Sequence, residues 1–476
     1  GEKVTVSFAG QSREAVAAED GTWMVSLKEM PVCAQGRPLI FQGSETAQPI
    51  ELKDVLVGEV WLAGGQSNMQ TTMDFYKTTT QADINQANDP LLRMITIPNK
   101  IYKDQNSARP RWAYTTPQTV SGFSASAYYF AKNLRETLKV PVGIIACSIG
   151  GTVAEAWMSR KTLESSEDLS RSLRACEQYY QKTFASESEY NRLHTEYEKA
   201  NSEWYRKRNA GEDPGPRPKE PIGPRYVNRP AGLYENMLTQ TIPYTIKGVI
   251  WYQGESNAIM KNSFQYRNVF ATLINEWRAD FQNSDLPFLF VQLATYGPPS
   301  NGSPYWPELC DAQQWAEDHV KNTGMIVLSD GGDQANIHPH SKPMVGYRLS
   351  LLARHMVYGE KDLICRGPRL KKMKVKNGAV ELTFKDIGSG LVLKPESVSA
   401  FEVCGKDGKY VPAEAVLVDG KIIVSSKEVP SPTNVRYGWR QFFVPTLYNV
   451  EGLPASAFRT DDFPLVSKDR YYLDDL

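Results

Sequence analysis

The sequence predicts an α/β fold in which a parallel sheet, covered by helices on both faces, is flanked by β modules and interrupted by a helical hairpin. Continuously apolar runs alternate with amphipathic segments in the middle of the chain, and alternation of apolar and polar residues marks both ends. Continuously apolar strands separated by helices are typical of parallel sheets buried on both faces. The 476 residues suffice for about two to four domains, and we expect domains at 1–57, 58–360 and 361–476.

The first domain, residues 1–57, is predicted to be a β module. Residues 4–8 alternate apolar and polar side chains, and residues 23–27 repeat the alternation after Asp20-Gly21. A period of two that is bounded by turn residues is typical of short antiparallel strands. We therefore expect a strand in each of these two segments.

The central domain contains the continuously apolar runs. Between them lie segments with helical spacing of apolar residues, of which 127–138 and 345–356 are clear examples. The predicted strands are 60–63, 94–97, 143–146, 248–251, 288–291 and 325–328. Their alternation with helices predicts a single parallel sheet.

An insertion at about residues 160–225 interrupts the central domain. Apolar residues recur at 3-4-3-4 spacing within 169–180 and again within 190–204, with charged residues between them. This spacing predicts a long helical hairpin laid on the domain. Alternation returns within 380–424, which predicts a second β module at 361–476.

Charge and composition exclude several classes of protein. The 54 Lys and Arg balance 54 Asp and Glu, whereas a nucleic-acid binder usually carries a basic excess. No apolar run approaches the ~18 residues that a membrane-spanning helix needs. The six cysteines are widely scattered, so we expect mostly buried, free thiols. No basic and then apolar leader begins at Gly1, and we expect that any signal peptide was removed or never present.

The sequence predicts neither a metal nor a cofactor. His338 and His340 are the only closely spaced histidines, but Pro339 separates them and no cysteine or third histidine lies nearby. The sequence does not indicate an oligomeric state.

Glycine-rich segments follow several of the predicted strands. They occupy residues 64–69, 148–152 and 253–257, and a fourth strand leads into 330–338. Ligands of open parallel sheets bind beyond the carboxyl ends of the strands, so we expect these segments to converge on one crevice. A serine just past a strand can face the crevice, glycine N–H groups and an asparagine amide can stabilise an oxyanion, and a later histidine can deprotonate the serine.

These segments resemble the sialate O-acetylesterases, a branch of the SGNH hydrolases. The resemblance rests on the sequences at 65–69, 150–152, 155–157, 251–257 and 337–339, and it extends through 435–439 and 447–456. It implies a flavodoxin-like three-layer core flanked by β modules. It also implies a metal-free serine esterase that removes O-acetyl groups from sialic acids.

The resemblance assigns the catalytic roles. Ser67 is expected to be the nucleophile and His338 the general base. The oxyanion hole is expected to combine the Ser67 N–H with a glycine of Gly150-Gly151 and the Asn257 side chain. Asn is also a preferred N-cap, so Asn257 has the alternative role of capping the following helix.

The triad acid departs from the family pattern. The family usually places an aspartate two or three residues before the histidine, where this chain has Asn336 and Ala335. Either His338 works in a dyad, oriented by a backbone carbonyl, or Asp330 or Asp333 reaches it from the preceding loop. We favour the dyad.

Two further assignments have alternatives. Gln66, Gln253 and Glu255 either bind substrate hydroxyls or brace the neighbouring loops. Ser148 is a rival nucleophile, because Ala-Cys-Ser-Ile-Gly at 146–150 approximates the nucleophile elbow of α/β-hydrolases. We expect Ser67 and not Ser148 to be acylated.

The expected activity is hydrolysis of O-acetyl esters, foremost 9-O-acetyl sialate, through an acetyl-enzyme. The alternatives are an acetyl esterase for plant polysaccharide such as acetylated xylan, and a non-catalytic glycan-binding protein. Because such glycans lie outside the cytosol, we expect a secreted or periplasmic bacterial enzyme, with a lysosomal or extracellular location as the alternative.

Overall fold

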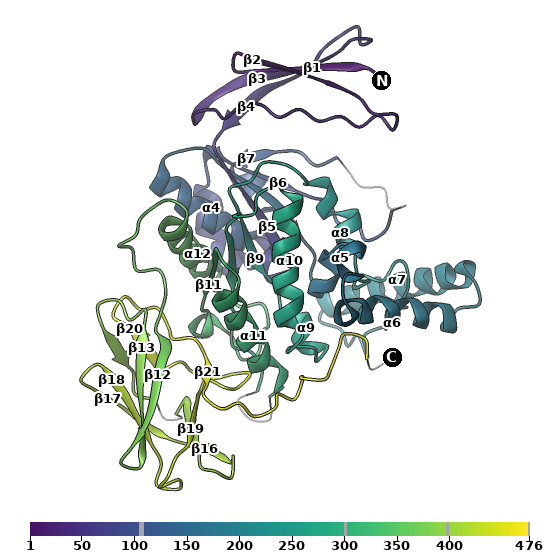
Figure 1. The fold of residues 1–476 in the computed structure, drawn as a ribbon. Helices are drawn as coiled ribbons and strands as arrows, with labels where there is room; N and C mark the ends of the chain where they lie inside the picture. Colours follow the sequence, from purple (N-terminus) through teal and green to yellow (C-terminus); the bar gives the residue numbers. More distant parts are fainter. Residues whose placement is uncertain (104–108, 299–301, 397–398, 475–476) are drawn as a thin grey trace.

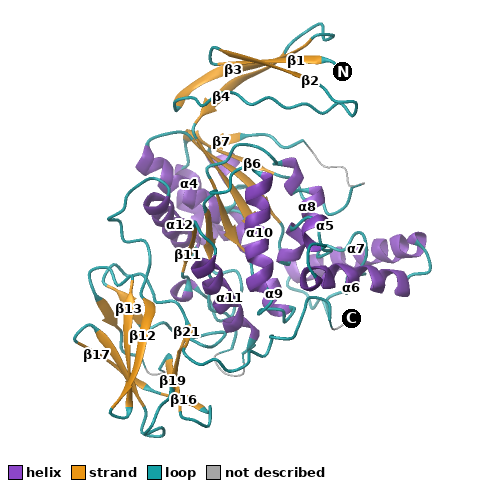
Figure 2. Cartoon of the chain, viewed as in Figure 1, coloured by secondary structure: helices purple, strands orange, loops and turns teal. Residues whose placement is uncertain are grey.

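The computed structural model describes residues 1–103, 109–298, 302–396 and 399–474 (Figure 1). Within them, a seven-stranded sheet with helices on both faces forms the centre (Figure 2). A four-stranded sheet precedes it, a β module follows it, and these two β parts lie at opposite ends of the molecule. The predicted α/β architecture is confirmed.

The central sheet is parallel apart from one edge strand. Its spatial order is β11 (Thr323–Ile326), β10 (Phe288–Val291), β9 (Gly248–Tyr252), β5 (Glu59–Gly65), β8 (Val142–Ser148), β6 (Asp89–Thr96) and β7 (Ala113–Thr115). Among the described strands of this sheet, only β7 pairs antiparallel with its neighbour, which is β6. The predicted strands are confirmed, but that at 325–328 lies two residues earlier because the chain turns into η4 (Ser329–Gly331). The short β7 was not predicted.

Aromatic contacts fix a layer of helices on each face of the sheet. Helices α4 (Ala125–Leu138) and α12 (Lys342–Met356) cover one face, and α10 (Tyr266–Asp280) and α11 (Tyr305–His319) the other (Figure 1). Trp61 of β5 meets Phe130 of α4 with ring centroids 5.1 Å apart. Trp251 of β9 meets Trp277 of α10 at 5.4 Å. All four rings are fully buried, so they anchor the helices to the sheet.

The insertion forms the predicted helical hairpin, which projects from the central domain (Figure 1). It contains α5 (Arg160–Leu163), α6 (Glu167–Thr183) and α7 (Glu187–Asn209). Helix α6 buries much of its apolar stripe, whereas α7 buries Tyr190 and His194 and leaves most of its length exposed. The other short helices are α1 (Ser67–Gln70), α2 (Lys77–Gln86), α3 (Pro117–Val120), α8 (Gly232–Asn236) and α9 (Glu255–Ile259), with 3₁₀ turns η1 (Asp74–Tyr76), η2 (Ala154–Trp157) and η3 (Leu238–Gln240).

The N-terminal sheet is antiparallel, with the order β2-β1-β3-β4. Its strands are β1 (Lys3–Phe8), β2 (Gln11–Val16), β3 (Cys33–Gly43) and β4 (Ile50–Val57). The strand predicted at 4–8 is confirmed, but the one predicted at 23–27 is wrong, because this segment pairs with no strand. Trp23 packs against Phe41 of β3 with ring centroids 5.9 Å apart. The alternation there therefore reflects side-chain packing of a loop.

The C-terminal β module packs two sheets around one core. One sheet has the order β12 (Arg369–Lys376), β13 (Ala379–Lys385), β18 (Lys421–Ser425) and β17 (Glu414–Val418), and the other β16 (Tyr410–Pro412), β15 (Phe401–Cys404), β19 (Asn434–Tyr437) and β21 (Phe458–Arg459). Strands β14 (Leu391–Leu393) and β20 (Leu447–Asn449) form a separate pair. Leu382 of β13 and Val403 of β15 are fully buried in the shared core.

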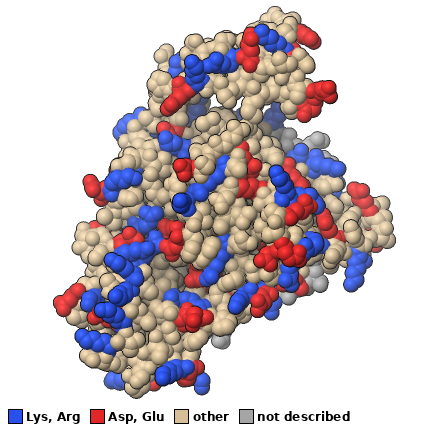
Figure 3. All heavy atoms as spheres, viewed as in Figure 1, with Lys and Arg blue, Asp and Glu red and all other residues tan. Residues whose placement is uncertain are grey.

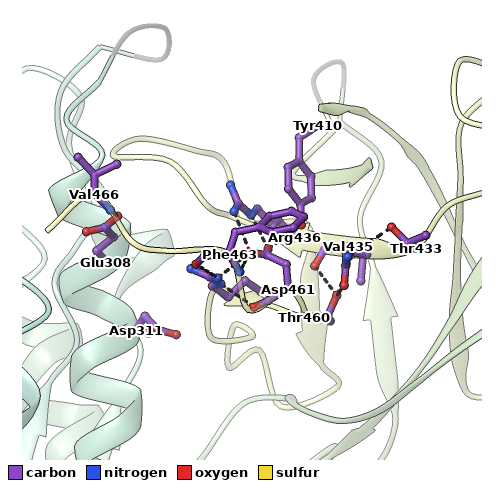
Figure 4. Close-up of polar contacts among 12 residues, drawn as sticks. Glu308, Asp311, Tyr410, Thr433, Val435, Arg436, Thr460, Asp461, Phe463 and Val466 are labelled. Atoms are coloured by element: carbon purple, nitrogen blue, oxygen red, sulfur yellow. Dashed lines mark hydrogen bonds and ion pairs between the residues drawn. The ribbon is translucent and has the colours of Figure 1, made fainter. Parts of the chain in front are cut away.

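The C-terminal segment returns from this module to the central domain. Arg436 donates to Asp461 through bonds of 2.8 and 3.1 Å, and the Val466 N–H donates to Glu308 of α11 at 2.7 Å (Figure 4). The described end of the chain is therefore fixed on the central domain.

The surface shows no large region of a single charge on the face that is drawn in Figure 3. On the face that Figure 3 shows, basic and acidic side chains are mixed over most of the surface. Five cysteines are buried and Cys33 is half-buried. Among the described residues, no helix combines the length and the apolar character needed to cross a membrane.

Candidate active site

The turns that follow β5, β8 and β9 begin at the same level of the sheet. In the strand register, Gly65 lies opposite both Ser148 and Tyr252. Gly65 has φ +135°, and a Cβ at this position would lie 2.2 Å from Tyr252 O, so only glycine fits here. The predicted convergence of the three turns is therefore confirmed.

Ser67 and His338 are in hydrogen-bond contact although they lie 271 residues apart. His338 Nε2 is 2.9 Å from Ser67 Oγ. Ser67 begins α1, directly after β5, and His338 lies in the loop between η4 and α12. Both side chains are half-buried, so solvent and a ligand can reach them. A hydroxyl bonded to an imidazole can be activated as a nucleophile.

Gly150 approaches the serine closely. A Cβ at Gly150 would lie 3.1 Å from Ser67 Cβ. The Gly150 N–H donates to Gln70 Oε1 at 2.8 Å. The N–H groups of Ser67 and Gly151, by contrast, have no hydrogen-bond acceptor among the described residues.

The Asn257 amide is not brought to Ser67, which corrects the expected oxyanion role. Its Nδ2 donates to Glu155 at 2.9 Å, and its Oδ1 accepts from Ala154 N–H at 3.0 Å and from Gln253 at 2.7 Å. Asn257 is fully buried. It also lies inside α9 and does not cap it, because Gly254 is the N-cap. Asn257 therefore braces the loops behind the site.

Gln253 and Gln66 brace loops as well, and the interpretation of Gln253 as a substrate ligand is wrong. Gln253 is fully buried; it donates to Thr152 O at 2.9 Å and accepts from the Tyr266 hydroxyl at 2.9 Å. Gln66 is 3% exposed and accepts from Ser256 N–H at 3.2 Å. These bonds tie the three turns to one another.

Glu255 belongs to a buried polar cluster beside Ser67. Asn68 Nδ2 donates to Glu255 Oε1 at 2.6 Å and to Ile337 O at 3.0 Å, while Asn68 Oδ1 accepts from Lys342. Burial raises the pKa of Glu255 and lowers that of Lys342 to about 7. Glu255, 2% exposed, therefore does not reach a substrate.

Neither candidate acid contacts His338. Arg348 holds both oxygens of Asp330 at 2.6 and 2.7 Å, and Asp333 accepts from the N–H groups of Ala335 and Asn336. Within the described residues, no carboxylate is bonded to the His338 ring. The geometry therefore fits the dyad and not a triad through Asp330 or Asp333.

Electrostatics at the base favour the neutral imidazole. Burial lowers the pKa of His338, and the cations of Lys342 and Arg208 lower it further. A neutral imidazole can accept the proton of Ser67. Arg208 lies at the end of α7, so the helical insertion contributes to the electrostatics of the site.

Sequence reasoning missed some residues that shape the site. Asn228, 5% exposed, accepts from Val153 N–H at 2.8 Å and donates to Gly151 O at 2.9 Å, and it thereby holds the second glycine turn. The Tyr472 hydroxyl of the C-terminal segment donates to Asn228 O at 3.0 Å. Lys342 was missed too. No local pattern marks Asn228 or Lys342, because their partners are distant in the sequence.

His340 is exposed, and its Nδ1 lies 3.5 Å from Thr79 Oγ1. No group of three metal-binding side chains occurs among the described residues.

The chain is similar to known carbohydrate esterases in sequence and in structure. The chain matches the family described as carbohydrate esterase, sialic acid-specific acetylesterase, over residues 57–186 and 223–354. It is 29% identical to the sialate O-acetylesterase of Pongo abelii over 515 residues, covering 98% of this chain and 88% of the relative. Its identity to the sialate O-acetylesterase of Homo sapiens is 29% over 494 residues, covering 94% and 84%. The crystal structure of a novel carbohydrate acetylesterase from Xanthomonas citri is similar with a TM-score of 0.77 and 32% identity, covering 97% of this chain and 93% of that chain.

Proposed function

Because this chain belongs to the carbohydrate esterase family of sialic acid-specific acetylesterases, we propose that it hydrolyses O-acetyl esters of sialic acids, such as 9-O-acetyl sialate. The relatives named sialate O-acetylesterase, which this chain matches over most of its length, support this activity. The observation that carries the chemistry is the 2.9 Å contact between Ser67 Oγ and His338 Nε2.

The reaction proceeds in two steps. His338 takes the proton of Ser67 as the hydroxyl attacks the acetyl carbonyl, and it returns this proton to the leaving sugar oxygen. The N–H groups of Ser67 and Gly151 receive the oxyanion, since they are free of other acceptors in the described chain. His338 then deprotonates a water that attacks the acetyl-serine, and it gives this proton to Ser67 Oγ as the ester bond breaks and acetate is released.

Acetylated sialic acid and acetylated polysaccharide carry the same acetyl group, so contacts to the sugar must distinguish the two substrates. A sialic acid carries a carboxylate, which an arginine or backbone N–H donors would bind. Arg208 lowers the pKa of His338, so its charge acts at the reacting groups, and within the described residues it has no carboxylate partner. We propose Arg208, whose guanidinium lies 5.5 Å from the centroid of the Trp204 ring, as the partner of an anionic sugar.

The experiment compares acetate release from O-acetylated sialic acid and from acetylated xylan at matched acetyl concentration. We expect the sialic acid ester to react faster. The alternative, an acetyl esterase for plant polysaccharide, is favoured by the similarity to the Xanthomonas citri carbohydrate acetylesterase. A faster reaction with xylan would establish that alternative and leave the mechanism intact.

The identity of the nucleophile is tested with a matched pair of variants. Ser67→Ala should lose essentially all activity towards a chromogenic acetyl ester, by about 10⁴-fold or more. Ser148→Ala should retain activity, because Ser148 has no histidine partner in the described structure. Stoichiometric labelling of Ser67 by a serine-reactive phosphonate would exclude a non-catalytic glycan-binding protein.

The setting of the enzyme follows from its substrates. Sialoglycans and polysaccharides lie outside the cytosol, so we propose a secreted or periplasmic location, with a lysosomal or extracellular one as the alternative. We further propose that 1–57, 58–360 and 361–476 are separate domains, each built around sheets of its own.

A further inference from the structure

The peptide group in front of His338 is held on both sides. Asn68 Nδ2 donates to Ile337 O at 3.0 Å, and Asn336 Oδ1 accepts from the His338 N–H at 2.9 Å. Pro339 follows and restricts the backbone of His338 to extended conformations. The two bonds hold this peptide plane and Pro339 restricts the rotation that follows it, so the direction of the His338 Cα–Cβ bond is confined without any contact to the ring.

Asn68 is itself fixed by charges of opposite sign. Its amide nitrogen donates to Glu255 Oε1 at 2.6 Å and its oxygen accepts from Lys342 Nζ, so the amide has one orientation only. Its backbone oxygen accepts from Ser126 Oγ at 2.8 Å. Asn68 directly follows Ser67, so this one residue connects the helix of the nucleophile with the loop of the base.

Lys342 and Glu255 are costly groups to bury. Lys342 has no exposed surface and lies between the rings of Tyr76 and Tyr252, with Nζ 5.2 and 5.3 Å from their centroids. Glu255 Oε2 has no hydrogen-bond partner among the residues that the structure describes. Apolar side chains would fill such a site at less cost in stability. The cluster therefore calls for a functional reason, and its connection through Asn68 to the residue after Ser67 and the residue before His338 provides one.

We propose that Asn68, locked between Lys342 and Glu255, is a positioning residue that orients His338 in place of a triad acid. The inference rests on the proposed esterase function. It differs from a triad in its electrostatics, because a carboxylate would raise the pKa of the imidazole whereas the Lys342 cation lowers it.

The first test is Asn68→Ala in the full chain, assayed with a chromogenic acetyl ester. We expect kcat to fall by about 10²-fold, the loss that a misplacement of about 1 Å produces, with KM changed by less than about twofold. His340→Gln is the matched control, because His340 lies two residues further in the same loop and its ring contacts Thr79 and Tyr76, whereas its bond to Lys342 N–H comes from the backbone oxygen, which the substitution retains. A kcat of Asn68→Ala within threefold of the wild type would overturn the proposal.

A second measurement does not depend on turnover. The chain has five histidines, so selective ¹⁵N-histidine labelling resolves the ring nitrogens of His338. In the wild type we expect the shifts of one tautomer bonded through Nε2, and in Asn68→Ala the averaged shifts of a mobile ring. Unchanged shifts would refute the positioning role. Absence of acetate release by the wild type would instead refute the proposed function, and the ring shifts would still decide the positioning.

The double variant Lys342→Met/Glu255→Gln covers the case in which Asn68→Ala does not fold, because it removes both buried charges together. The cations that act on His338 are Lys342 and Arg208, and Glu255 acts on Lys342. Loss of Lys342 should raise the pKa of His338, so the acidic limb of kcat/KM should move to higher pH and kcat should fall. An unmoved limb with unchanged kcat would contradict the proposal.

Discussion

Gly150→Ala tests how tightly the second glycine turn confines the nucleophile. The new Cβ would lie 3.1 Å from Ser67 Cβ and 3.3 Å from Gln70 Oε1, where ordinary contacts begin at 3.4 Å. The backbone of Gly150 is not in the left-handed region, so the methyl group adds no backbone strain. The substitution therefore acts through its contacts with Ser67, which is the closer one, and with Gln70.

The size of the effect follows from that contact. Ser67 must give way by about 0.3 Å to restore an ordinary distance. If a displacement of about 1 Å costs about 10²-fold, a displacement of 0.3 Å costs about fourfold, so we expect kcat to fall by about 3- to 10-fold. The free energy of unfolding should change little, because the two side-chain contacts, to Ser67 and Gln70, need only small adjustments and no hydrogen bond is lost.

Gly151→Ala is the matched variant with the opposite expectation. A Cβ there meets nothing within 4 Å, but Gly151 has φ +76°. We expect unfolding to become easier by about 1–2 kcal/mol, with a smaller loss of kcat than in Gly150→Ala. Steady-state kinetics with a chromogenic acetyl ester and urea denaturation measure both quantities. Full activity in Gly150→Ala would refute the reasoning, because Ser67 would then not be confined by this turn.

Three further predictions concern the base, the sugar and the second turn. Only neutral His338 can accept a proton, and burial lowers its pKa. We therefore expect kcat/KM to stay constant as the pH falls past the ordinary histidine pKa of about 6.5 and to decrease only at lower pH. A decrease of kcat/KM with a midpoint above pH 6.5 would contradict this. Arg208→Gln should raise KM for acetylated sialic acid by about 10-fold, because one charged contact is lost, and should leave KM for a neutral acetyl ester unchanged. Equal changes in KM for the two substrates would exclude Arg208 as the anchor. Asn228→Ala should lower the free energy of unfolding by about 1–3 kcal/mol and also lower kcat, because Val153 N–H and Gly151 O lose their hydrogen-bond partner. Calorimetry measures the stability and steady-state kinetics measures kcat. An unchanged free energy of unfolding would contradict this prediction.

The central sheet could be predicted because its signal is local. Each buried parallel strand is a continuous apolar run, and the helices α4 and α12 carry clear apolar stripes. The failures lie where the pattern has another cause. The alternation at 23–27 arises from packing of a loop, and β7 is too short to show a period.

The contact between Ser67 and His338 could also be expected, because the resemblance assigned both residues. The hydrogen-bond partners of the neighbouring motif residues could not be predicted. Asn257 and Gln253 stand in the same motif, yet they bond to Glu155 and Thr152 behind the site. Sequence shows that a residue type belongs to a motif, but burial and hydrogen-bond partners decide whether it reaches a substrate.

The division between reacting groups and bracing groups bears on how the sugar is chosen. In the proposed mechanism Ser67 and His338 act on the acetyl group, which is common to all acetylated sugars, and the motif glutamines and asparagines are buried as braces. The sugar must therefore be recognised by groups outside these motifs. We propose Arg208 as one of them, and its helix α7 lies entirely between the two stretches that match the family, 57–186 and 223–354. If Arg208 binds the sugar as proposed, a change in the insertion should alter the preferred sugar without disturbing the loops that hold Ser67 and His338.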